Sequence, residues 1–84
     1  MKIYIVDITR YELGEEAPRD EEQLFFLNKA NADQYFNNIN PAEYIGDARE
    51  TQRDDRYGTL LKIYTTDDHM NSLWVQLREM ETRD

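Results

Sequence analysis

Carboxylates are the side chains whose number and spacing suggest chemistry in this chain. Its 84 residues include eighteen Asp and Glu against ten Lys and Arg, a formal net charge of −8. A charge of this size opposes compaction by self-repulsion and attracts positively charged partners. The acids gather in three patches along the sequence: Glu15, Glu16, Asp20, Glu21 and Glu22; Glu43, Asp47, Glu50 and Asp54; and Asp67, Asp68, Glu79, Glu81 and Asp84.

The second patch has the spacing of one side of a helix. If residues 41–55 form a single helix, its four acids fall at i, i+4, i+7 and i+11 and make one narrow ridge. The ridge would be about 16 Å long, comparable with several phosphates of one DNA strand at ~3.4 Å each. Carboxylates so arranged could replace phosphates on a basic protein surface. The alternative is a solvated face that only aids solubility, and Gly46 abolishes the ridge if it ends the helix.

Two further features extend the predicted binding surface. Tyr44 and Tyr57 flank the ridge, and tyrosines beside charges commonly anchor protein interfaces. The first patch lies in a connection containing Gly14 and Pro18, which could fold onto a basic partner or remain a plain solvated loop. It lacks the alternating pattern of a calcium loop. The predicted partner-binding residues are Glu15, Glu16, Asp20, Glu21, Glu22, Glu43, Tyr44, Asp47, Glu50, Asp54, Asp55 and Tyr57.

The usual sets of catalytic residues are missing from the sequence. His69 is the only histidine, and nucleophilic catalysis needs a nucleophile beside a base that a third group orients. Most acids lie in polar runs rather than apolar ones, and the three glycines are too far apart for a phosphate-binding loop. We therefore expect no catalysis, no metal and no cofactor. A small enzyme using His69 with Asp67 and Asp68 remains a third possibility.

Composition also indicates where the chain works. An acidic surface is repelled by nucleic acid and by anionic membranes, so direct binding to either is disfavoured. The absence of cysteine favours a reducing, cytoplasmic setting. The first ten residues are apolar over too short a stretch for a signal peptide or a spanning helix. We expect one soluble domain over residues 1–84.

The N-terminal half of the sequence predicts two strands and a helix. Residues 1–11 are β-rich and apolar on both alternating faces, which is typical of a central strand. A short strand follows at 24–27. Asn28 is a candidate cap for a helix, because the next apolar residues recur at i, i+3, i+4 and i+7. These apolar residues are Ala32, Tyr35, Phe36 and Ile39.

The C-terminal half predicts a second helix, a strand and a third helix. Asn40 and Pro41 look like the cap and first residue of a helix. Residues 57–66 read as a strand, and a capping box at 65–68 precedes a helical stripe of Met70, Leu73, Trp74, Leu77 and Met80. Val75 lies off that stripe and indicates a second buried face or a homodimer contact.

These elements predict an α+β fold in the order β-β-α-α-β-α. A three-stranded sheet would have the first strand at its centre, paired antiparallel with the second, and helices packed on it. In size and charge the chain resembles the phage-encoded nucleic-acid mimics and the small anti-CRISPR proteins.

This resemblance implies a non-catalytic inhibitor in the host cytoplasm. Its acidic surface would block the basic nucleic-acid-binding surface of another protein. The alternative is a structural or regulatory accessory subunit that binds through an apolar patch or a sheet edge.

Overall fold

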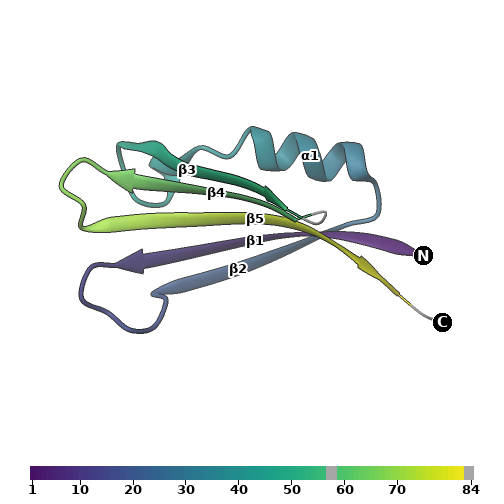
Figure 1. Ribbon diagram of the computed structural model, residues 1–84, viewed down its shortest axis with the longest axis horizontal. Coiled ribbons are helices and arrows are strands. Elements are labelled where there is room, and N and C mark those ends of the chain that lie inside the picture. Colours follow the sequence, from purple (N-terminus) through teal and green to yellow (C-terminus); the bar gives the residue numbers. More distant parts are fainter. Residues whose placement is uncertain (57–58, 83–84) are drawn as a thin grey trace.

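Within the part of the chain that the structure describes, the protein forms one five-stranded antiparallel sheet with a single α-helix on one face (Figure 1). The computed structural model describes residues 1–56 and 59–82. The strand order is β2-β1-β5-β4-β3, and every neighbouring pair is antiparallel. The elements are β1 (Lys2–Glu12), β2 (Asp20–Phe26), α1 (Lys29–Asn37), the 3₁₀ helix η1 (Pro41–Glu43), β3 (Ala48–Arg56), β4 (Thr59–Thr66) and β5 (Asn71–Glu81).

The core lies between α1 and the face of the sheet that it covers. Val6, Leu73 and Val75 are fully buried there, and α1 contributes Ala32 and Phe36. Because side chains alternate between the two faces of a strand, the helix side takes the even positions of β1 and the odd positions of β5. The predicted stripe of α1 is confirmed, since its four residues all contact this core.

The predicted α+β fold with a three-stranded sheet and several helices is wrong. Among the described residues the structure is mostly β, with one nine-residue α-helix. β1 does pair antiparallel with β2, as predicted. β2 is longer than the predicted strand at 24–27, so Asp20, Glu21 and Glu22 lie in a strand and not in the predicted loop. Its other neighbour is β5 rather than the strand at 59–66, and β5 is the central strand.

The predicted C-terminal helix is strand β5. Its apolar residues satisfy two periods at once, since Leu73, Val75 and Leu77 also alternate at period 2. The segment becomes a strand rather than a helix because it pairs with β1 on one side and β4 on the other. Such long-range contacts override local preference. Val75 is correspondingly a core residue beneath α1 and does not mark a homodimer contact.

The predicted helix over residues 41–55 is also wrong. Asn40 caps it and Pro41 begins it as expected, but only the 3₁₀ turn η1 forms. Gly46 then adopts φ +83°, a left-handed conformation that ends helices. The residues after it form the edge strand β3, which carries a bulge between Glu50 and Gln52. The four acids of the second patch therefore make no helical ridge.

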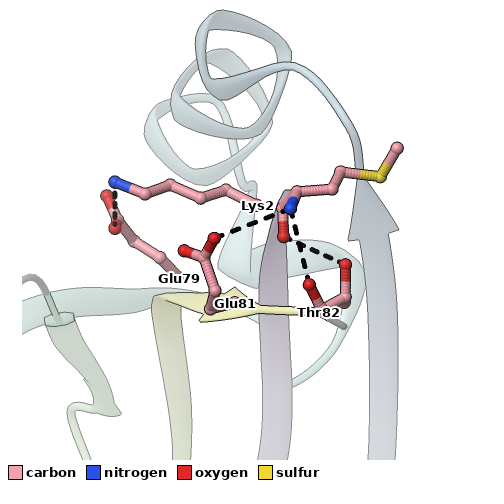
Figure 2. Close-up of polar contacts among 5 residues, drawn as sticks. Lys2, Glu79, Glu81 and Thr82 are labelled. Carbon is pink, nitrogen blue, oxygen red and sulfur yellow. Dashed lines mark hydrogen bonds and ion pairs between the residues drawn. The ribbon is translucent and has the colours of Figure 1, made fainter. Parts of the chain in front are cut away.

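Residues 1–2 and 79–82 are joined where β1 and β5 meet at one end of the sheet. The Nζ atom of Lys2 lies 3.6 Å from a carboxylate oxygen of Glu79, and the amino group of Met1 lies 3.6 Å from one of Glu81. Figure 2 draws Lys2, Glu79, Glu81 and Thr82 at this end of the sheet. The Thr82 backbone N–H donates to the Met1 carbonyl oxygen, with 2.7 Å between nitrogen and oxygen. Charges at this end are therefore largely paired.

Candidate functional site

One end of the sheet gathers most of the net charge. A row of paired residues crosses all five strands there, formed by Asp20, Arg10, Leu73, Tyr64 and Glu50 in order from β2 to β3. The segments at and beyond this row are the β1–β2 connection, the stretch from η1 to the start of β3, and the β4–β5 turn (Figure 1).

We call this part of the molecule the acidic end. It carries nine acids and three arginines, a net charge of −6, so only −2 remains on the rest of the 84 residues. Its acids are Glu12, Glu15, Glu16, Asp20, Glu43, Asp47, Glu50, Asp67 and Asp68.

The structure brings most of the predicted binding residues to this end. Asp54 and Asp55 are exceptions, because they lie in the second half of β3 opposite Leu61 and Leu60. Tyr57 lies outside the described residues. Those at the acidic end or adjoining it are Glu15, Glu16, Asp20, Glu21, Glu22, Glu43, Tyr44, Asp47 and Glu50.

A hollow of about 430 Å³ lies where the start of β2 faces η1. At its wall Arg10 approaches the Asp20 carboxylate at 2.6 Å and donates to the Tyr44 carbonyl at 3.5 Å. The Arg10 Nε atom is buried and has no partner among the described residues. One arginine thus faces several carboxylates, and the hollow stays acidic. Its lining residues are Ile8, Arg10, Asp20, Glu21, Glu22, Glu43, Tyr44 and Leu73.

The side chain of Tyr44 forms part of the wall of this hollow. Burial raises the pKa of Tyr44, and the neighbouring Tyr35 hydroxyl and the carboxylates of Glu22 and Glu43 raise it further. Each of these causes disfavours a phenolate. Tyr44 therefore stays neutral and is suited to contact and hydrogen bonding rather than to acid–base chemistry.

The β4–β5 turn holds the residues of the alternative catalytic hypothesis. The carboxylate of Asp68 accepts from the Thr66 hydroxyl at 2.6 Å and from the Met70 N–H at 3.0 Å, and these bonds lower the pKa of Asp68. His69 has φ +60° and is exposed. Asp67 pairs with Arg49 across the strands. The predicted capping box at 65–68 does not begin a helix. These residues form the end of β4 and the turn that follows it, which the hydrogen bonds of Thr66 and Asp68 stabilise.

Lys62 is a feature that sequence patterns did not indicate. It lies on the helix side of β4 with an exposed fraction of 1%. Its ammonium lies 4.6 Å from the centroid of the Phe36 ring and 5.4 Å from that of Tyr64, which are cation–π distances. Within the described part of the chain it makes no ion pair. Only its alternation with apolar neighbours in β4 could have predicted its burial.

Within residues 1–56 and 59–82, no three His, Asp or Glu side chains are arranged to hold a metal ion. Over the same residues, no helix has the length and apolar character needed to cross a membrane. Comparisons with protein-family models, with curated proteins and with solved structures found no match.

Proposed function

We propose that this protein is a non-catalytic binding protein whose acidic end occupies the basic, nucleic-acid-binding surface of another protein. The observation that carries the proposal is the convergence of three separate segments, with a net charge of −6, at one end of the sheet. The acids are brought together by strand pairing and not by the predicted helix. A charge concentrated on one part of a surface attracts a partner of opposite sign and orients it.

Pairing within the chain leaves part of this charge available. Arg10, Arg19 and Arg49 are the three arginines of the acidic end, and each already contacts a carboxylate. Glu16, Glu43 and Asp47 make no ion pair among the described residues and project from exposed positions. These free carboxylates can meet lysines and arginines that otherwise contact phosphates. In this respect the proposal follows the resemblance to nucleic-acid mimics and anti-CRISPR proteins.

Capture from a host lysate tests the proposal. Immobilised protein should retain a basic nucleic-acid-binding protein that elutes with salt, and added duplex DNA should compete with the chain for it. The double variant Glu16→Lys/Glu43→Lys should lose the captured protein. Retention that is insensitive to both salt and DNA would contradict the proposed mode of binding.

A second candidate function is an accessory subunit that binds through an apolar surface. The observation favouring it is the sheet face opposite α1, which carries the exposed side chains of Phe25, Trp74 and Met80. Such a subunit would keep its partner in high salt, because burial of apolar surface does not depend on charge attraction. The salt elution step therefore separates the two functions.

A further inference from the structure

A second hollow, of about 560 Å³, lies between α1, η1 and the end of β2. Its volume is within the usual range of ligand sites, roughly 300–1,000 Å³. We call it the aromatic hollow, because Phe26, Tyr35 and Tyr44 line it. It shares Glu43 and Tyr44 with the hollow of about 430 Å³ beside Arg10, which we call the acidic hollow. A side chain bound in the aromatic hollow would therefore lie next to the acidic end.

The fold holds the aromatic residues of this hollow in place. The ring centroids of Phe26 and Tyr35 lie 5.6 Å apart in a tilted arrangement. The backbone N–H of Tyr44 donates to the Pro41 carbonyl at 3.0 Å, and the Tyr44 carbonyl accepts from Arg10. Both tyrosines also pack against the core. Walls that are formed before a ligand arrives lower the entropic cost of binding it.

Carboxamides from one side of α1 contribute to the same lining. Asn31, Gln34 and Asn38 are spaced at i, i+3 and i+7, which places them on neighbouring turns of the helix and its C-cap. Asn28 and Asn40 use their side-chain oxygens as helix caps. The three lining side chains, in contrast, are exposed and make no hydrogen bond among the described residues. Each offers a carboxamide oxygen that can accept from an N–H donor.

The charge of the two hollows selects a cation. Of the described residues that line the aromatic hollow, only Glu43 is charged. It is exposed and makes no ion pair within residues 1–56 and 59–82. The adjoining acidic hollow adds three more acids against Arg10 alone. An anion would be repelled here, and an apolar ligand would cover the carboxamides without satisfying them. A cation is attracted by the acids and can lie over the aromatic rings.

We propose that the aromatic hollow binds an arginine side chain of the basic partner. A guanidinium is planar, stacks on aromatic rings and carries five N–H donors in a fixed fork. It therefore suits the rings, the carboxamide oxygens and the carboxylate of Glu43 together. A lysine ammonium has three donors and no plane to stack. This inference rests on the proposed function, because the arginine belongs to the surface that the acidic end covers.

Titration of the full chain with N-acetyl-arginine amide tests the hollow without the partner. Proton–nitrogen correlation spectra follow the binding, and they include the side-chain NH₂ groups of Asn31, Gln34 and Asn38. We expect saturable shifts of these signals and of the backbone signals of η1, at millimolar concentrations of the probe. N-acetyl-citrulline amide has nearly the same shape without the charge and should bind at least about tenfold more weakly. N-acetyl-lysine amide should also bind more weakly than the arginine derivative.

Matched variants make the test specific. Glu43→Gln should weaken binding of the arginine derivative about tenfold, the loss expected for one charge-assisted hydrogen bond. Asp54→Asn removes the same charge outside both hollows and should change the affinity less than about twofold, since exposed charges are screened over distance. Asn38→Leu removes a carboxamide without changing the net charge and should also weaken binding. Circular dichroism verifies that each variant folds.

Equal binding of the arginine and citrulline derivatives overturns the proposal, and so does equal binding of the lysine derivative. A Glu43→Gln variant that binds the arginine derivative as tightly as the unmodified chain overturns it too. Capture that is lost in Glu16→Lys/Glu43→Lys but unchanged in Asn38→Leu would overturn the arginine anchor and leave the proposed function standing. A chain that binds the arginine derivative in this hollow and captures no basic protein would instead contradict the proposed function and support the arginine site.

Discussion

Gly46 is the residue on which the architecture of the second acidic patch depends. It has φ +83°, and no atom beyond its two chain neighbours lies within 4 Å of the place where a Cβ would be. A side chain at this position would therefore be disfavoured by the left-handed backbone conformation and not by a steric clash.

We predict that Gly46→Ala lowers the free energy of unfolding by roughly 1–2 kcal/mol, the cost of a left-handed conformation for an L-residue. Denaturant titration measures the change. Gly46→Asn is the control, because asparagine tolerates this conformation better, and its loss should be smaller. Equal stability of Gly46→Ala and the unmodified chain would show that the segment adopts another conformation.

Asp68 gives the β4–β5 turn a dependence on pH. Hydrogen bonds from Thr66 and then Met70 lower the pKa of Asp68 in the folded state. A lowered pKa means that the unfolded chain binds the proton more readily, so stability is present above the unfolded pKa and is lost as pH falls through the folded one.

We predict that Asp68→Asn lowers the melting temperature at neutral pH and reduces its fall in acid. Thermal melts over a pH series measure both. Asp67→Asn is the matched control, because Asp67 is 75% exposed and faces only Arg49, so its effect should be smaller. A larger effect of Asp67→Asn would contradict the assignment.

At the scale of elements, helix α1 depends on its cap. The side chain of Asn28 accepts from the N–H groups of Ala30 at 2.8 Å and Asn31 at 3.3 Å. Removing this acceptor leaves backbone donors at the first turn without their partner.

We predict that Asn28→Ala costs about 1 kcal/mol of unfolding free energy, the usual value for an N-cap asparagine. Chemical denaturation measures it, and Asn28→Asp should restore most of the stability. Asn37→Ala, at an exposed position in the last turn, serves as a control and should change stability little. An unchanged Asn28→Ala would mean that the cap contributes nothing to the fold.

The elements differ in how well the sequence predicts them, and the reason is physical. β1 and α1 carry unambiguous apolar periods and a cap, so local residues specify them. β5 satisfies both the helical and the strand period, and its state depends on partners far along the chain. β3 is an exposed edge strand of polar residues with no apolar alternation to reveal it. Capping signals at Asn40 and Pro41 were correct, but they began only one 3₁₀ turn.

The candidate site follows the same division. The composition shows directly that acids outnumber bases. Most of the predicted binding residues do lie at or beside the acidic end. Sequence spacing assigned the second acidic patch to a helix and the first to a loop. The proximity of the two patches arises from connections that the antiparallel sheet brings to one end. Strand pairing over long separations could not be read from one sequence.

At the scale of the whole molecule, the carboxylates of the acidic end repel one another. Nine acids and three arginines share one end of a body that measures 45 × 24 × 22 Å. Charges at exposed positions are screened over about 10 Å at 0.1 M salt. Screening should therefore relieve repulsion in the folded state more than in the expanded unfolded chain.

We predict that sodium chloride raises the melting temperature, and that the double variant Glu16→Gln/Glu43→Gln shows a weaker dependence on salt. Scanning calorimetry at low and moderate ionic strength measures it. A melting temperature that falls with added salt would contradict the concentration of charge at one end.

Association kinetics with the captured partner test the central claim most directly. Glu16→Lys/Glu43→Lys and Asp54→Lys/Asp55→Lys change the net charge equally, but only the first pair lies at the acidic end. We predict that the first variant slows association at least about tenfold and flattens its dependence on salt, while the second changes it much less. Equal effects of the two variants would contradict the claim, because total charge rather than the acidic end would then govern binding.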